Sequence, residues 1–105
     1  MTSYPENATL ESLQQYVKDK CHERGFDKAG DLETFLLFME EVGEMAKAIR
    51  DRRGLFQEGD PKQEHLAEEM SDVLSYLLEL ANRFRVDLNA ALRRKEALND
   101  RRSWK

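Results

Sequence analysis

The sequence is poor in the residues that disulfide scaffolds, turn-rich β folds and membrane spans require. It has a single cysteine, Cys21, so no disulfide can form within the chain, and a reducing, cytoplasmic setting is expected. Five glycines and two prolines in 105 residues favour long helices over a turn-rich fold. No apolar stretch approaches the roughly 20 residues that a transmembrane helix needs. We expect one all-α domain over residues 1–105, without a signal peptide or a membrane contact.

The charge of the chain argues against a polyanionic partner. It has 17 Lys and Arg against 21 Asp and Glu, a formal net charge of −4. This balance gives no reason to expect nucleic acid or an anionic membrane surface as a partner. An anionic small ligand would need a bound divalent cation to reverse the local field. A chain of this length buries only a modest core, which leaves room for a partner subunit that adds buried area.

Four helices are predicted from the spacing of apolar residues and from capping residues. The first lies between an N-cap at Thr9 and a terminating glycine at Gly25. The four helices are expected over residues 10–24, 31–53, 61–84 and 88–102. Asp31 is the expected N-cap of the second helix, Pro61 lies in the first turn of the third, and Asp87 is the expected N-cap of the fourth. A loop is predicted over residues 54–62.

The second and third helices each have an apolar face, a charged face and acidic residues on the border between them. The apolar faces are expected to form the core; they comprise Phe35, Phe38, Met39, Val42, Met45, Ala46 and Ile49, then Leu66, Met70, Val73, Leu74, Leu77, Ala81 and Phe84. Glu79 is placed on the face of the third helix that is expected to contact water. The border residues are Glu41 and Glu44 on the second helix, with Glu69, Asp72 and Tyr76 on the third.

The two acidic pairs have the spacing that a metal site on paired helices needs. Residues three apart on a helix project in the same direction, as Glu41 and Glu44 do, and as Glu69 and Asp72 do. If the two helices pack antiparallel, four carboxylates can face one another. One such pair at 4 Å costs about 4 kcal/mol at an effective dielectric constant of 20, which a hard cation would offset. Oxygen-only ligands favour Mg²⁺, with Mn²⁺ as a substitute, over Zn²⁺.

The same spacing also arises without any metal. In a chain with 21 acidic residues, acidic pairs three apart are expected several times by chance, usually on a solvated face. The border position of both pairs, with Tyr76 one turn after Asp72, favours the metal site. The spacing alone leaves both interpretations open.

A resemblance to a known family rests first on the two acidic strings. EEVGEM at 40–45 and EEMSDVL at 68–74 resemble the paired E-x-x-E and E-x-x-D signature of MazG-type nucleotide pyrophosphohydrolases. Tyr76 follows the aspartate by four residues, as in the branch that includes the dCTP pyrophosphatases. The similarity extends over about residues 9–104.

The last helix adds to this resemblance. Lys95, Asn99 and Arg102 match the K-x-x-x-N-x-x-R ending of the same branch. Phe26 is similar to one member of an aromatic and histidine cluster that the branch has before its second helix. Where the dCTP-preferring relatives have a tryptophan seven residues after the second glutamate, this sequence has Asp51, so the resemblance leaves the base preference open.

The resemblance implies a four-helix MazG-like bundle, assembled as a dimer or a dimer of dimers. It implies a Mg²⁺-dependent enzyme that splits a nucleoside triphosphate into monophosphate and pyrophosphate, as in house-cleaning of the nucleotide pool. The implied metal ligands and catalytic residues are Glu41, Glu44, Glu69 and Asp72. The implied substrate-binding residues are Tyr76, Lys95, Asn99, Arg102 and Phe26, some of them acting on a neighbouring subunit.

Other functions are compatible with the same sequence. Phosphoribosyl-ATP pyrophosphohydrolases and all-helical dUTPases are related enzymes with specialised substrates. A non-catalytic helical adaptor would use its acidic stripes only as solvated or partner-binding surfaces.

Overall fold

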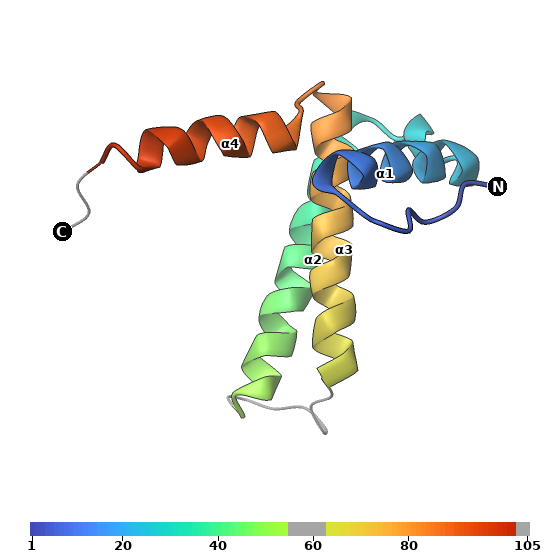
Figure 1. The fold of residues 1–105 in the computed structure, drawn as a ribbon. Helices are drawn as coiled ribbons and strands as arrows, with labels where there is room; N and C mark the ends of the chain where they lie inside the picture. The colour runs from blue at the N-terminus through green and yellow to red at the C-terminus, as the bar shows by residue number, and fades with distance from the viewer. Residues whose placement is uncertain (55–62, 103–105) are drawn as a thin grey trace.

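The computed structural model describes residues 1–54 and 63–102 (Figure 1). The helices are α1 (Leu10–Arg24), α2 (Asp31–Arg52), α3 (Gln63–Arg83) and α4 (Leu88–Asn99), with a short 3-10 turn, η1 (Phe26–Lys28), between α1 and α2. The all-α class with four helices is therefore confirmed. Residues 55–62 of the predicted loop and the predicted helix start at Pro61 lie outside the described residues. Within the described residues, no helix combines the length and apolar character that crossing a membrane requires.

Local hydrogen bonds explain where the helices begin and end. The Thr9 hydroxyl accepts from the Ser12 N–H at 3.0 Å, and the Ser12 hydroxyl oxygen accepts from the Thr9 N–H at 2.8 Å. α1 ends at Gly25, whose φ of 76° is in the left-handed region that glycine adopts without strain. Asp87 caps α4 by accepting from the Ala90 N–H at 3.1 Å, as predicted.

The predicted cap of α2 is wrong by one residue. Gly30 is the N-cap and Asp31 is the first helical residue. The Glu33 carboxylate accepts from the Gly30 N–H at 3.3 Å, so a side chain three residues later does the capping. At the other end of the chain, α4 stops at Asn99 rather than at Arg102.

α2 and α3 lie side by side and antiparallel, as their predicted short connection requires (Figure 1). α1 crosses the C-terminal half of α3, and α4 projects away from the pair. The main contacts of α4 are with α1. One chain therefore does not close a four-helix bundle, because its fourth helix does not pack along α2 and α3.

Gln14 determines where α4 begins. Its side chain, 9% exposed, donates to the Asn82 Oδ1 at 3.2 Å and to the Val86 carbonyl at 2.9 Å. The side-chain Oε1 of Gln14 accepts from the Leu88 N–H at 2.8 Å. The side chain of Asn82 donates to the backbone carbonyl of Gln14 at 2.9 Å. These bonds hold the segment between α3 and α4 against α1, and so direct α4 outward.

The predicted core faces of α2 and α3 are largely exposed in the single chain. The exposed members are Phe35, Met39, Ala46 and Ile49 on α2, Met70, Leu74 and Leu77 on α3, and Phe84 just after α3. Ala81 on α3 is buried as predicted, and other buried side chains are Thr34 and Ala48 on α2 with Leu78 and Leu80 on α3. The prediction failed because the two helices turn their border faces, which carry the acidic residues, toward each other.

Candidate metal centre and adjoining cavity

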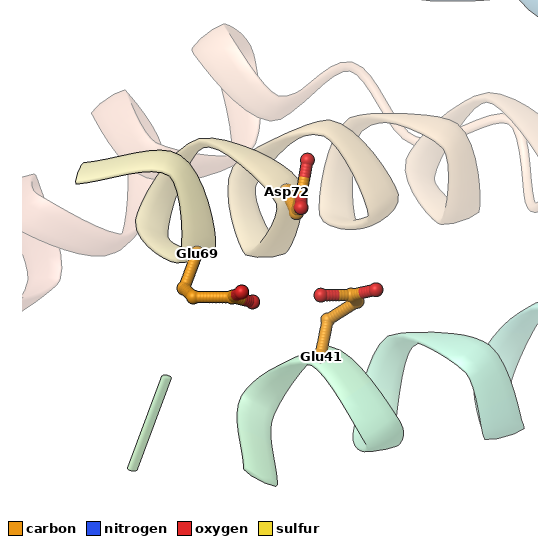
Figure 2. Close-up of side chains that lie close together, drawn as sticks. All are labelled: Glu41, Glu69 and Asp72. Carbon is orange, nitrogen blue, oxygen red and sulfur yellow. The ribbon is translucent and has the colours of Figure 1, made fainter. Parts of the chain in front are cut away.

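Three carboxylates meet between α2 and α3 (Figure 2). Glu41 projects from α2, and Glu69 and Asp72 project from α3 one turn apart. One oxygen from each of the three lies within 4.8 Å of the others. Oxygens at this spacing can ligate one hard cation from two helices.

Mutual repulsion, together with the partial burial of Glu41 and Glu69, makes this cluster costly without a cation. Burial raises the pKa of Glu41, and hydrogen bonding to Glu69 and the charge of Asp72 raise it further. With the carboxylates ionised, the buried Oε2 of Glu69 has no donor in the described part of the chain. A buried acceptor without a partner is rare in folded proteins. The donor set therefore fits a divalent cation with oxygen ligands, which would satisfy this atom and neutralise the cluster.

Glu44 lies outside the group of three. It is on α2, one turn after Glu41, and its side chain is exposed. Its proximity along the helix keeps it within reach of a cation held by Glu41. Its role as a fourth ligand stays a prediction.

A cavity of about 410 Å³ adjoins the cluster. Glu41 and Asp72 form part of its wall, and the two predicted substrate-binding aromatics, Tyr76 and Phe26, line it as well. Burial raises the pKa of Tyr76, with the charges of Glu41, Glu79 and Asp72 adding to the effect. Ligand sites for small molecules commonly enclose about 300–1,000 Å³. The structure thus brings the acidic cluster and an aromatic-walled cavity together within one chain.

The predicted substrate-binding residues at the end of the chain are elsewhere. Lys95 and Asn99 are on α4 and Arg102 lies just beyond it, and none of the three lines the cavity. α4 projects away from the α2–α3 pair (Figure 1). One chain therefore does not join these residues to the carboxylates.

Glu79 is a cavity residue that was predicted to contact water. It is 8% exposed, lines the cavity, and forms an ion pair with Arg83 at 3.1 Å. The helical period would have located it: seven residues after Asp72 is nearly two full turns, so both side chains share one face of α3.

The cluster predicts that a divalent cation stabilises the fold. Because folding raises the pKa of Glu41, ionisation of Glu41 destabilises the folded chain. The free energy of unfolding without metal therefore decreases as pH rises through that pKa. Glu41→Gln should raise the melting temperature without metal and weaken the stabilisation by Mg²⁺. For the parent chain, this stabilisation reaches about 2.7 kcal/mol when the Mg²⁺ concentration is 100 times its Kd. Thermal melts with Mg²⁺ and with chelator measure both effects.

Glu40→Gln is the matched control, since Glu40 is exposed on α2 and lies outside the group of three. It should leave the Mg²⁺ response unchanged. Equal Mg²⁺ responses in parent and Glu41→Gln would remove Glu41 from the metal site.

Cys21 lines the cavity, and the pKa of its thiol depends on its surroundings there. Burial and the nearby Glu79 carboxylate raise the pKa of its thiol from 9.0 to about 11. The thiolate fraction at pH 8 is then lower by about two orders of magnitude. The rate of alkylation by iodoacetamide should inflect near pH 11 in the folded chain and near the ordinary value in urea. An unshifted inflection in the folded chain would contradict this placement of Cys21.

The chain is similar to known proteins over most of its length. The chain is 35% identical over 109 residues to dCTP pyrophosphatase 1 of Homo sapiens and 34% identical over 105 residues to dCTP pyrophosphatase 1 of Bos taurus. Each match covers 95% of this chain and 62% of the relative, so the chain spans about 62% of the length of these relatives. Residues 30–102, which include the metal-site candidates and α4, match the MazG nucleotide pyrophosphohydrolase domain. The chain therefore belongs to the MazG nucleotide pyrophosphohydrolase family.

Proposed function

We propose that this protein hydrolyses nucleoside triphosphates to nucleoside monophosphates and pyrophosphate with Mg²⁺, for which Mn²⁺ can substitute. The observation that carries the proposal is the meeting of three carboxylates from two helices at the wall of a cavity of about 410 Å³. A cation site beside a cavity of nucleoside size suits a substrate with an anionic phosphate chain and an aromatic base. Membership of the MazG family and the similarity to two proteins named dCTP pyrophosphatase 1 support it.

Each part of the site has a proposed role. Glu41, Glu69 and Asp72, joined by Glu44, would hold the Mg²⁺, which when bound lowers the pKa of a water molecule and neutralises phosphate charge. Tyr76 and Phe26 would contact the nucleoside in the cavity. Water adds to the α-phosphorus, and the bond to the oxygen that bridges the β-phosphate breaks, so pyrophosphate leaves.

The protein is proposed to act as a homo-oligomer, a dimer or a dimer of dimers. The exposed apolar faces of α2 and α3 support this, because contiguous apolar surface on a small chain usually marks an interface. The outward direction of α4 supports it too, since Lys95, Asn99 and Arg102 then have a route to the site of a neighbouring subunit. Cations delivered there would bind phosphates that the carboxylates alone would repel.

The oligomer is tested by placing a charge on the apolar face. Leu74→Glu, at a position 46% exposed in the single chain, should lower the mass in solution toward the 12.3 kDa of one chain because a charge would be buried without a partner. Light scattering coupled to gel filtration measures this mass. Lys18→Glu, on the exposed face of α1, should leave it unchanged. A parent chain already at 12.3 kDa would contradict the proposal.

The reaction is tested by pyrophosphate release from a panel of ribo- and deoxyribonucleoside triphosphates, including dUTP, and from phosphoribosyl-ATP. Hydrolysis should require Mg²⁺ and stop with chelator. Asp72→Asn should lower kcat/KM by about 100-fold or more, because a metal ion contributes several kcal/mol to the transition state. Glu40→Gln should retain the activity.

The outcome of the panel also separates the alternatives. Turnover of dUTP or phosphoribosyl-ATP alone would replace the general nucleotide-clearing function by a specialised one. Folded protein that is inactive on every compound would overturn the enzymatic proposal and favour a binding role.

A further inference from the structure

Another carboxylate lies in the cavity, away from the metal cluster. Glu79 is on the same face of α3 as Asp72 and Tyr76, about 10 Å further along the helix axis than Asp72. It is 8% exposed and lines the cavity together with these two residues. If the proposed function holds and phosphates bind at Asp72, a nucleoside that extends along α3 past Tyr76 brings its base to Glu79.

Arg83 holds the Glu79 carboxylate in one position. The Nε and Nη2 of Arg83 both donate to Oε1 of Glu79, at 3.2 Å and 3.1 Å. Arg83 is itself fixed, because its Nη1 donates to the Ala29 carbonyl at 2.7 Å and its Nη2 to the Phe26 carbonyl at 3.1 Å. A carboxylate held by a bound guanidinium is preorganised to accept a hydrogen bond from a ligand.

The carboxylate retains capacity to accept a further hydrogen bond. Among the described residues, the bonds from Arg83 to Glu79 all end on Oε1. The other side chain that hydrogen-bonds to this carboxylate is the Cys21 thiol, a weak donor on the same cavity wall. An ionised carboxylate offers about four acceptor positions and no donor. A stronger N–H donor from a ligand can therefore bind here.

Nucleobases differ in the group that they would present to such an acceptor. Cytosine and adenine carry an exocyclic amino group, which donates, where uracil, thymine and hypoxanthine carry a carbonyl oxygen, which accepts. An amino group would complete the hydrogen bonds of Glu79. A carbonyl oxygen would leave the carboxylate buried without that bond and would be repelled by it, so its binding costs the desolvation of both groups.

We propose that Glu79 is a specificity-determining residue that selects amino-bearing bases, cytosine over uracil and adenine over hypoxanthine; this role rests on the proposed function. Phe26 and Tyr76 would contact a base whichever group it carries, and Glu79 would distinguish an amino group from a carbonyl oxygen. A hydrogen bond to a charged group makes the expected preference roughly 10- to 100-fold in kcat/KM.

The test compares three pyrimidine triphosphates that differ at position 4 of the ring: an amino group (cytosine), a carbonyl oxygen (uracil) and hydrogen (pyrimidin-2-one). The sugar is the one that the parent chain hydrolyses faster. Cytosine should be preferred, pyrimidin-2-one intermediate and uracil poorest. Glu79→Gln keeps an oxygen that can accept from Arg83 but adds an N–H₂ donor, so the cytosine-to-uracil ratio of kcat/KM should fall about 10-fold or more.

The ratio is measured on one preparation, so any loss of folded protein in the variant cancels. Glu11→Gln, an exposed position outside this cavity, is the matched control and should leave the ratio unchanged. A parent ratio near one would overturn the inference. So would a Glu79→Gln variant that slows all three substrates equally, because Glu79 would then serve only to hold Arg83.

Failure of the selective role of Glu79 is distinguishable from failure of the proposed function. Hydrolysis with no base preference leaves the proposed function intact and removes the role of Glu79. If no triphosphate is hydrolysed, calorimetry with CMP and UMP still tests the preference by affinity. Equal affinities of the parent chain for the two monophosphates would overturn it.

Discussion

The contact between α2 and α3 determines most other features of this molecule, because the two helices bring together the faces that carry carboxylates. Two antiparallel helices usually pack apolar side chains against each other. Here small or half-polar residues such as Thr34 and Ala48 are buried on α2, and Glu41 faces Glu69 and Asp72. The repulsion that results is the reason for a cation. It also leaves the most apolar faces of both helices outside, where they need a second surface to cover them.

The sequence predicted the helices well because their ends are set locally. Thr9, Gly25 and Asp87 each act within a few residues, and the structure confirms them at the expected positions. The spacing of the acidic residues likewise predicted that two acidic pairs face each other, and three of the four carboxylates, Glu41, Glu69 and Asp72, do meet, while Glu44 lies outside the group. The cap of α2 was misplaced because Glu33 caps from inside the helix, a role that any acidic residue in a first turn could take.

The features that could not be predicted depend on contacts between distant segments. Apolar periodicity shows which face of a helix avoids water, but it does not show whether another helix of the same chain or another molecule covers it. The direction of α4 depends on Gln14, which bonds to residues 68 to 74 positions away. The burial of Glu79 depends on Arg83 reaching back to the carbonyls of Phe26 and Ala29.

Arg83 links parts of the molecule that would otherwise vary independently. Its guanidinium, whose side chain is 14% exposed, joins the buried Glu79 to the backbone of η1 and, at 3.4 Å, to Asp31 at the start of α2. An apolar side chain at position 79 would take the nearer of two carboxylates from this guanidinium, and an apolar side chain at position 83 would leave the buried carboxylate without its cation and two carbonyls without a donor. A single apolar substitution at either position should therefore lower the free energy of unfolding. A redesign of the cavity would have to exchange both residues together and rebuild the turn that they support.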